Sequence, residues 1–149
     1  MSNIRITKSF SFETGHALYG YDGLCKNVHG HSYKLDVTVI GTPIKDSNNV
    51  KFGMVIDFKD LKKIVKSEIV EVFDHATVFN QNTPHVELAQ TLKDSGHKVL
   101  LVDYQPTSEE MIIDFAAKIT AKLPSSIQLH HLRLQETATS FAEWFAADQ

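Results

Sequence analysis

Two segments near the start of the chain alternate between apolar and polar residues, which is the pattern of strands buried on one face. They span residues 3–16 and 29–41 and are joined by about twelve residues with no helical pattern. We therefore expect them to pair as an antiparallel hairpin whose connection runs from about Ala17 to Val28. The apolar stripes are Ile4, Ile6, Phe10 and Phe12, broken by Lys8, and then Tyr33, Leu35, Val37 and Val39.

Helical periodicity follows from residue 57 onward. Asp57 can cap a helix with one apolar stripe up to Phe73, and Thr83-Pro84 opens a shorter helix that Gly96 closes. Residues 98–104 predict a strand. Thr107 and Glu110 have the spacing of a capping box before a second long helix, and a last strand covers about residues 128–136. This order predicts a single α+β domain over residues 1–149 with an antiparallel sheet.

Three histidines share the inward face of the predicted hairpin. Side chains at alternate positions of a strand point to the same face, so His29 and His31, separated by Gly30, continue the second apolar stripe. By the same count, His16 continues the first. The hairpin would bring all three together, and Gly30 leaves room for a close approach of the backbone. A lone histidine on an apolar face is more often a core residue, but three of consistent parity near Cys25 favour a metal site, and zinc is the usual occupant.

The role of Cys25 stays open at this point. It is either a fourth ligand, which would close a structural site, or a reactive thiol that leaves the fourth position to water or substrate. The spacing of the residues does not decide between these two interpretations.

Composition and charge exclude several classes of function. The formal net charge of −3 and the pI near 6.2 offer no basic surface for nucleic acid. No apolar run has membrane-spanning length, and the N-terminus has no signal-peptide pattern. The single cysteine excludes an intrachain disulfide. We therefore expect a reduced, cytoplasmic setting in which a free thiol can take part in chemistry, and no binding to nucleic acid or membranes.

Two acidic positions need an explanation. Glu136 has the inward parity of the last strand, where a carboxylate is costly unless it has a partner. The partner is either a cationic protein group or a ligand with two parallel N–H donors. Asp74-His75 follows the first long helix, where by itself the pair would only place a cation near the negative end of the helix dipole.

The chain resembles the 6-pyruvoyl-tetrahydropterin synthase/6-carboxytetrahydropterin synthase family. The matching segments occur in the family's order and cover nearly the whole chain. They are Phe12 to His16, Cys25-x-x-x-His29-Gly30-His31-Ser32-Tyr33, Gly53-Met54-Val55-Ile56-Asp57-Phe58, Asp74-His75-Ala76, Pro106-Thr107-Ser108-Glu109 and Leu134-Gln135-Glu136-Thr137.

The resemblance implies a role for each candidate residue. His16, His29 and His31 would bind one catalytic zinc ion per subunit, with no organic cofactor. Cys25 would act as general base rather than as a ligand. Asp74 and His75 would assist proton transfer, and Glu136 would anchor the pterin ring. Glu109 stays outside the catalytic set.

The resemblance also implies an assembly, known as the tunnelling fold. Each subunit would have two strands, two helices and two strands, with both long helices on one face of an antiparallel sheet. Trimers would close a barrel, and two trimers would stack into a homohexamer with active sites at the subunit interfaces. The short helix near residues 84–95 would be an insertion between the first helix and the third strand.

The spacing between Cys25 and His29 resembles that of the bacterial 6-carboxytetrahydropterin synthases of the queuosine pathway. The expected reaction converts 7,8-dihydroneopterin triphosphate into 6-carboxy-5,6,7,8-tetrahydropterin, acetaldehyde and triphosphate. The animal 6-pyruvoyl enzymes typically have a longer spacer, and another branch has a glutamate near the cysteine position, which residues 26–28 do not offer. The alternatives are a 6-pyruvoyl-tetrahydropterin synthase and a non-catalytic, zinc-stabilised oligomeric module with Cys25 as fourth ligand.

Overall fold

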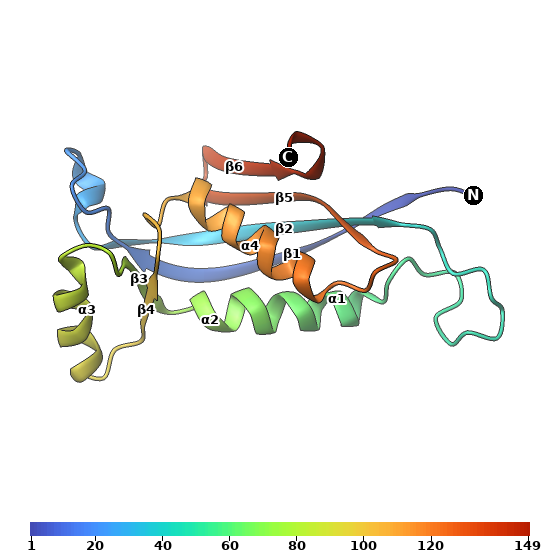
Figure 1. Cartoon of the computed structure of the whole chain (residues 1–149), viewed down its shortest axis with the longest axis horizontal. Helices are drawn as coiled ribbons and strands as arrows, with labels where there is room; N and C mark the ends of the chain where they lie inside the picture. Colours follow the sequence, from blue (N-terminus) through green and yellow to red (C-terminus); the bar gives the residue numbers. More distant parts are fainter.

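The protein is built on a curled six-stranded sheet with helices, as the computed structural model of the whole chain, residues 1–149, describes it (Figure 1). The strand order across the sheet is β4-β3-β1-β2-β5-β6. The strands are β1 (Ile4–His16), β2 (His29–Gly41), β3 (Ala76–Asn80), β4 (Val99–Val102), β5 (Gln128–Thr137) and β6 (Ser140–Phe145).

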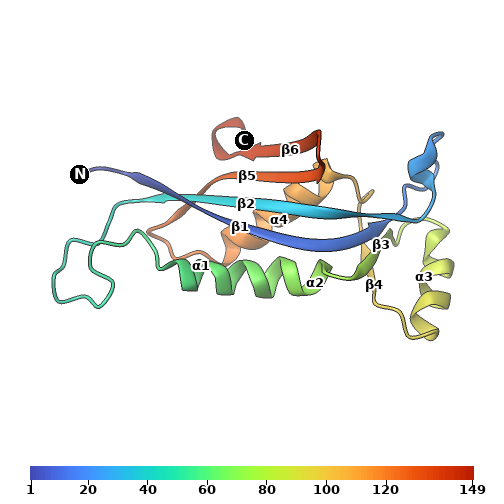
Figure 2. The same ribbon diagram turned by 180° about the vertical axis from the view of Figure 1, so that it is seen from behind.

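The predicted hairpin is confirmed along its whole length. β1 and β2 pair antiparallel from Ile4↔Gly41 to His16↔His29 without a break in register. Because the register is continuous, the inward parity of both strands is preserved up to the histidines. The alternate positions of β1, such as Ser9, Ser11 and Glu13, are exposed, so this face of the sheet has no covering layer along β1 (Figure 2).

The two long helices share one core with the inward face of the sheet. α1 (Phe58–Val65) continues through a π-helical turn (Lys66–Val70) into α2 (Glu71–Phe73), and α4 is Ser108–Lys122. The predicted caps are confirmed, since the side chains of Asp57 and Thr107 accept from the backbone N–H groups of Lys59 and Glu110. Fully buried members of this core include Phe12, Tyr33, Leu35, Leu61, Ile69, Phe73, Phe115, Ile119, Leu132 and Leu134.

The expectation of a purely antiparallel sheet is wrong at one end of the sheet. β3 pairs parallel with both β1 and β4, and α3 (His85–Asp94) connects β3 to β4 as the crossover that parallel strands require. The inserted segment is therefore a strand and a helix rather than a helix alone. β6 was also not predicted, and it extends the other edge by pairing antiparallel with β5. None of the helices is both long and apolar enough to cross a membrane.

Candidate active site

The end of the β1–β2 hairpin brings the three histidines together. His16 and His29 are cross-strand partners, and His31 lies opposite Thr14. One ring nitrogen from each of the three histidines lies within 4.8 Å of the other two. His16 is almost completely buried, with 2% of its surface exposed, whereas His29 and His31 are partly exposed. The predicted convergence of the three imidazoles is present, and their nitrogens form a possible metal-binding group.

Backbone carbonyls fix the tautomers of two of these rings. His16 Nδ1 lies 2.6 Å from the carbonyl oxygen of Pro106, and His29 Nδ1 lies 2.6 Å from that of Asn27. A carbonyl oxygen only accepts, so each Nδ1 carries the proton and each Nε2 presents a lone pair. The two Nε2 atoms are 3.1 Å apart. Two lone pairs at this distance repel each other unless a cation lies between them.

Zinc is a cation that fits this donor set. Zinc ligands in proteins are commonly imidazole nitrogens, whose second nitrogen typically donates to a carbonyl or carboxylate group. Two nitrogens on a tetrahedral zinc ion lie about 3.4 Å apart, close to the observed separation of His16 Nε2 and His29 Nε2. Burial lowers the pKa of both His16 and His31, which favours the neutral imidazoles that a metal requires.

Glu136, at the end of β5, lies beside the histidine group. Its Oε1 is 2.9 Å from His31 Nε2, although the alignment is too poor for a hydrogen bond. Its Oε2 accepts from the hydroxyl of Ser108, the buried first residue of α4. Glu136 also lines a surface pocket of about 340 Å³ together with Ser108, Glu109 and residues of β6. Glu136 points to the inward face of the sheet, and its carboxylate therefore lies between His31 and this pocket.

Cys25 lies in a 3₁₀ turn (Leu24–Lys26) within the connection between β1 and β2. The thiol is partly buried and is not a member of the group of nitrogens formed by the three histidines. It lies within electrostatic range of Tyr33 on β2. Burial raises the pKa of the Tyr33 phenol far above its ordinary value, and the carboxylate of Glu136 acts in the same direction.

Asp74 and His75 are held where the helix α2 leads into β3. The backbone N–H of Glu13 donates to Asp74 Oδ1 at 2.8 Å, and the ammonium of Lys98 donates to the Asp74 carbonyl at 2.7 Å. The amide of Glu13 is also the main reason that the pKa of Asp74 lies below its ordinary value. Asp74 Oδ2 is 3.1 Å from His75 Nδ1, so the carboxylate orients the imidazole.

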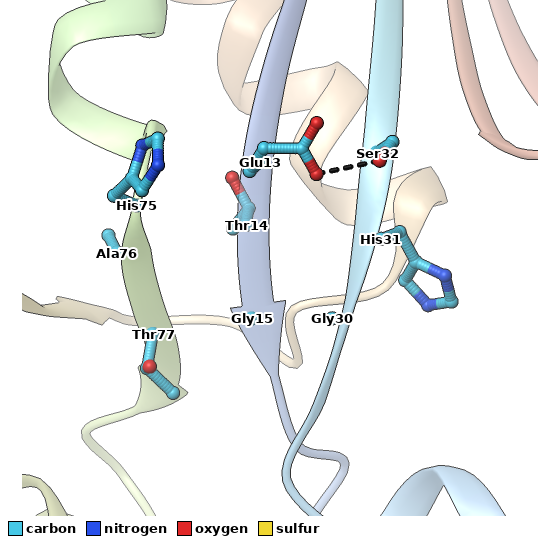
Figure 3. Close-up of a pocket in the computed structure, with 9 residues that line it drawn as sticks. All are labelled: Glu13, Thr14, Gly15, Gly30, His31, Ser32, His75, Ala76 and Thr77. Carbon is cyan, nitrogen blue, oxygen red and sulfur yellow. Dashed lines mark hydrogen bonds between the residues drawn. The ribbon is translucent and has the colours of Figure 1, made fainter.

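The Asp74–His75 pair is separate from the group of three imidazole nitrogens. His75 lines a pocket of about 320 Å³ whose other members include His31 and Thr14 as well as Glu13, Gly15, Gly30 and Ser32. Figure 3 shows the rings of His75 and His31 on opposite sides of this pocket. No hydrogen bond or ion pair connects either Cys25 or His75 to the three histidines. Neither Cys25 nor His75 is therefore in direct polar contact with the imidazole group, although His75 and His31 line the same pocket.

The structure corrects one expectation and adds residues to the site. The space left by Gly30 faces the carbonyl of Thr14 on β1, 3.2 Å from where a Cβ would be, so glycine here permits close strand pairing rather than approach to a metal. Ser108 and the carbonyl of Pro106 were not predicted as site groups, although both lie in the matched Pro106–Glu109 segment. Tyr33 was predicted only as a core position.

Comparison with known proteins agrees with this geometry. The model of the family described as 6-pyruvoyl tetrahydropterin synthase matches residues 5–147. A Haemophilus influenzae protein named 6-carboxy-5,6,7,8-tetrahydropterin synthase is 39% identical over 94% of this chain and 97% of its own length. A Rickettsia bellii protein of the same name is 30% identical over 94% and 99%. The solved structure of Caenorhabditis elegans 6-pyruvoyl tetrahydropterin synthase shares the fold, with a TM-score of 0.70, 23% identity and coverage of 98% and 97%.

Proposed function

The chain belongs to the 6-pyruvoyl tetrahydropterin synthase family, and we propose that within this family it is a zinc-dependent 6-carboxy-5,6,7,8-tetrahydropterin synthase. The substrate is 7,8-dihydroneopterin triphosphate, and the products are 6-carboxytetrahydropterin, acetaldehyde and triphosphate, as in queuosine biosynthesis. The names of the two bacterial relatives support this choice. The observation that carries the chemistry is the pair of Nε2 lone pairs of His16 and His29, 3.1 Å apart beside His31.

His16, His29 and His31 would hold one zinc ion per subunit. When bound by three imidazoles, zinc keeps an open coordination position and supplies a Lewis acid that polarises a substrate oxygen. The carbonyls of Pro106 and Asn27 keep two of the imidazoles in the tautomer that directs Nε2 to the metal.

Cys25 is the proposed general base. It lies in the turn that leads to His29, outside the imidazole group, which leaves its sulfur, as the thiolate, free to accept a proton from the substrate's side chain. A cation nearby favours the thiolate form of a cysteine. Proton transfer by a positioned side chain typically accelerates a reaction by about 10²–10⁴-fold.

Glu136 is the proposed anchor of the pterin ring. Its Oε2 is oriented by the hydroxyl of Ser108, and its Oε1 has only a poorly aligned contact with His31. When a metal takes His31 Nε2, Oε1 loses this neighbour and can accept from a ligand. Two parallel N–H donors of a pterin match the two oxygens of a carboxylate, which fixes the ring and therefore the position of its side chain.

Asp74 and His75 are proposed to act in a site that a second copy completes. The imidazole of His75 is 77% exposed and lines a pocket that His31 also lines, so the pair is open to a neighbouring copy. Assembly into a homohexamer, as the family resemblance implies, would put this pair next to the Cys25 of another copy. The edge strands β4 and β6 support such assembly, since edges present unpaired backbone groups to a neighbouring copy.

A complementation experiment tests the shared site. Cys25→Ala and His75→Ala are expected to be inactive alone, and mixing the two variants under conditions that exchange subunits is expected to restore part of the activity. Restoration occurs only if one intact Cys25 and one intact His75 from different copies meet in a site. A mixture as inactive as its components, with subunit exchange verified by mass spectrometry, would contradict the proposal.

Two other functions are separated by simple observations. A 6-pyruvoyl-tetrahydropterin synthase would share the site but yield a 6-pyruvoyl product from the same substrate. A zinc-stabilised module with Cys25 as fourth ligand would lose zinc in Cys25→Ala, whereas the proposed enzyme keeps zinc and loses turnover. The position of Cys25 outside the histidine group favours the enzyme.

A further inference from the structure

Tyr33 has a buried hydroxyl without a hydrogen-bond partner. Its side chain is fully buried at 0% exposure. Only three buried side-chain nitrogen or oxygen atoms in the chain lack a partner, and two of them are His31 Nε2 and the Tyr33 hydroxyl oxygen. These two atoms belong to residues on the same face of β2, one position apart in the inward stripe. A bound metal would provide the missing partner of His31 Nε2, but no group in the protein is a hydrogen-bond partner for the Tyr33 hydroxyl.

Packing fixes the Tyr33 ring next to the proposed metal site. The ring stacks on Phe12, its cross-strand partner, with centroids 5.5 Å apart and an interplanar angle of 15°. It meets the imidazoles of His16 and His31 nearly edge-on, at centroid distances of 6.3 and 5.6 Å. The phenol ring therefore has a fixed position beside the imidazoles.

The groups around the phenol are those proposed to handle the substrate. His31, whose ring is 5.6 Å from that of Tyr33, has its Nε2 2.9 Å from the carboxylate of Glu136. A proposed metal ligand and the proposed pterin anchor thus lie near a phenol whose hydroxyl has no partner. A neutral phenol has one O–H donor, and a buried donor without an acceptor costs stability. If Tyr33 had only a structural role, the protein would be more stable with phenylalanine at this position.

We propose that Tyr33 is a further catalytic residue, whose O–H donates a hydrogen bond to an oxygen of the substrate's side chain as negative charge develops there. This proposal rests on the proposed function. No proton is transferred to or from Tyr33. The bond strengthens when Cys25 removes the neighbouring proton, because the charge left on the substrate is shared with that oxygen. A donor already in place in a buried site needs no reorganisation at that moment, which makes it more effective than water.

The test compares Tyr33→Phe with the matched variant Tyr104→Phe. Both remove one hydroxyl oxygen, but the Tyr104 hydroxyl has a partner within the protein, since it donates to Asp114 at 2.6 Å. We expect Tyr33→Phe to lower kcat roughly 10²-fold with little change in KM. Its zinc content should equal that of the wild type, and its Tm should be equal or higher. Tyr104→Phe should show the reverse: unchanged kcat and a lower Tm.

Each other result overturns the proposal for a stated reason. A kcat of Tyr33→Phe equal to that of the wild type, or a change confined to KM, means that the hydroxyl does not act on the transition state. A lower Tm means that the hydroxyl has a partner within the protein. A loss of zinc means that Tyr33 supports the metal site instead. Absence of turnover in the wild type refutes the proposed function itself, and is recognised before any variant is compared.

Discussion

The backbone of His75 provides a test of whether the candidate site stores strain. His75 is the only residue other than glycine with a positive φ, at 62°. A residue with a side chain costs about 1–2 kcal/mol in this left-handed region, whereas glycine enters it freely but loses about 0.5–1 kcal/mol more chain entropy on folding. Glycine at position 75 should therefore be more stable than alanine by about 1 kcal/mol.

The rest of the side chain contributes little to this difference. The imidazole of His75 is 77% exposed, and its contact with Asp74 is partly solvated. Exposed pairs of this kind contribute about 0–1 kcal/mol, and both His75→Gly and His75→Ala remove it. The comparison of the two variants therefore isolates the backbone. For a chain of this length, 1 kcal/mol corresponds to a difference in Tm of roughly 2–4 °C.

Thermal unfolding followed by circular dichroism measures this difference. Protein and zinc concentrations must be the same in all samples, because assembly and metal binding raise the apparent stability. The pair Lys62→Gly and Lys62→Ala is the control, since Lys62 is an exposed residue within α1. There the order should be reversed, with alanine more stable by about 1 kcal/mol. His75→Ala at or above His75→Gly in Tm would refute the strain argument.

Activity separates strain from function in the same proteins. Both substitutions at position 75 remove the imidazole, so both should lower kcat by roughly 10²–10⁴-fold if the ring transfers a proton. His75→Gly would then be a stable but inactive protein, which is the result expected where a strained backbone is kept for function. Full activity in either variant would exclude a catalytic role for His75.

Three further substitutions test the other parts of the site. Cys25→Ala should keep one zinc ion per subunit, measured by atomic spectrometry, and lose turnover; a loss of zinc would identify a fourth ligand. His16→Ala should lose zinc and lower Tm, since it removes both a ligand and a buried hydrogen bond to Pro106; zinc retained in full would contradict the metal site. Glu136→Gln should raise KM for the pterin roughly tenfold or more, because it weakens a charged acceptor of the ring N–H groups; an unchanged KM would exclude the anchor.

The fold was predictable where the sequence has strong periodicity. The alternation in β1 and β2 gave the hairpin, its register and the inward parity of the histidines, and the apolar stripes gave both long helices. β3 was missed because it has only five residues, Ala76–Asn80, and its buried apolar residues Ala76, Val78 and Phe79 do not alternate strictly with polar ones. β6 was missed because the turn between Thr137 and Ser140 contains no glycine or asparagine to signal a hairpin.

The part of the site that could be predicted from residue positions alone is the group of three histidines. Parity alone brings His16, His29 and His31 together, because side-chain direction along a paired strand follows from counting residues. A catalytic role for Asp74 and His75 was predicted only through the family resemblance, and their position beside β1 depends on the parallel pairing of β3, which was not predicted. The role proposed for Tyr33 depends on the absence of a partner for its hydroxyl, which no sequence pattern reveals.

The most direct test of the proposed reaction is the identity of its product. The zinc-loaded protein is incubated with 7,8-dihydroneopterin triphosphate under anaerobic conditions, and the products are identified by mass spectrometry beside a Cys25→Ala control. We predict 6-carboxytetrahydropterin and acetaldehyde in equal amounts, with neither in the control. A 6-pyruvoyl product without acetaldehyde, or no turnover by protein that holds zinc, would contradict the proposed function.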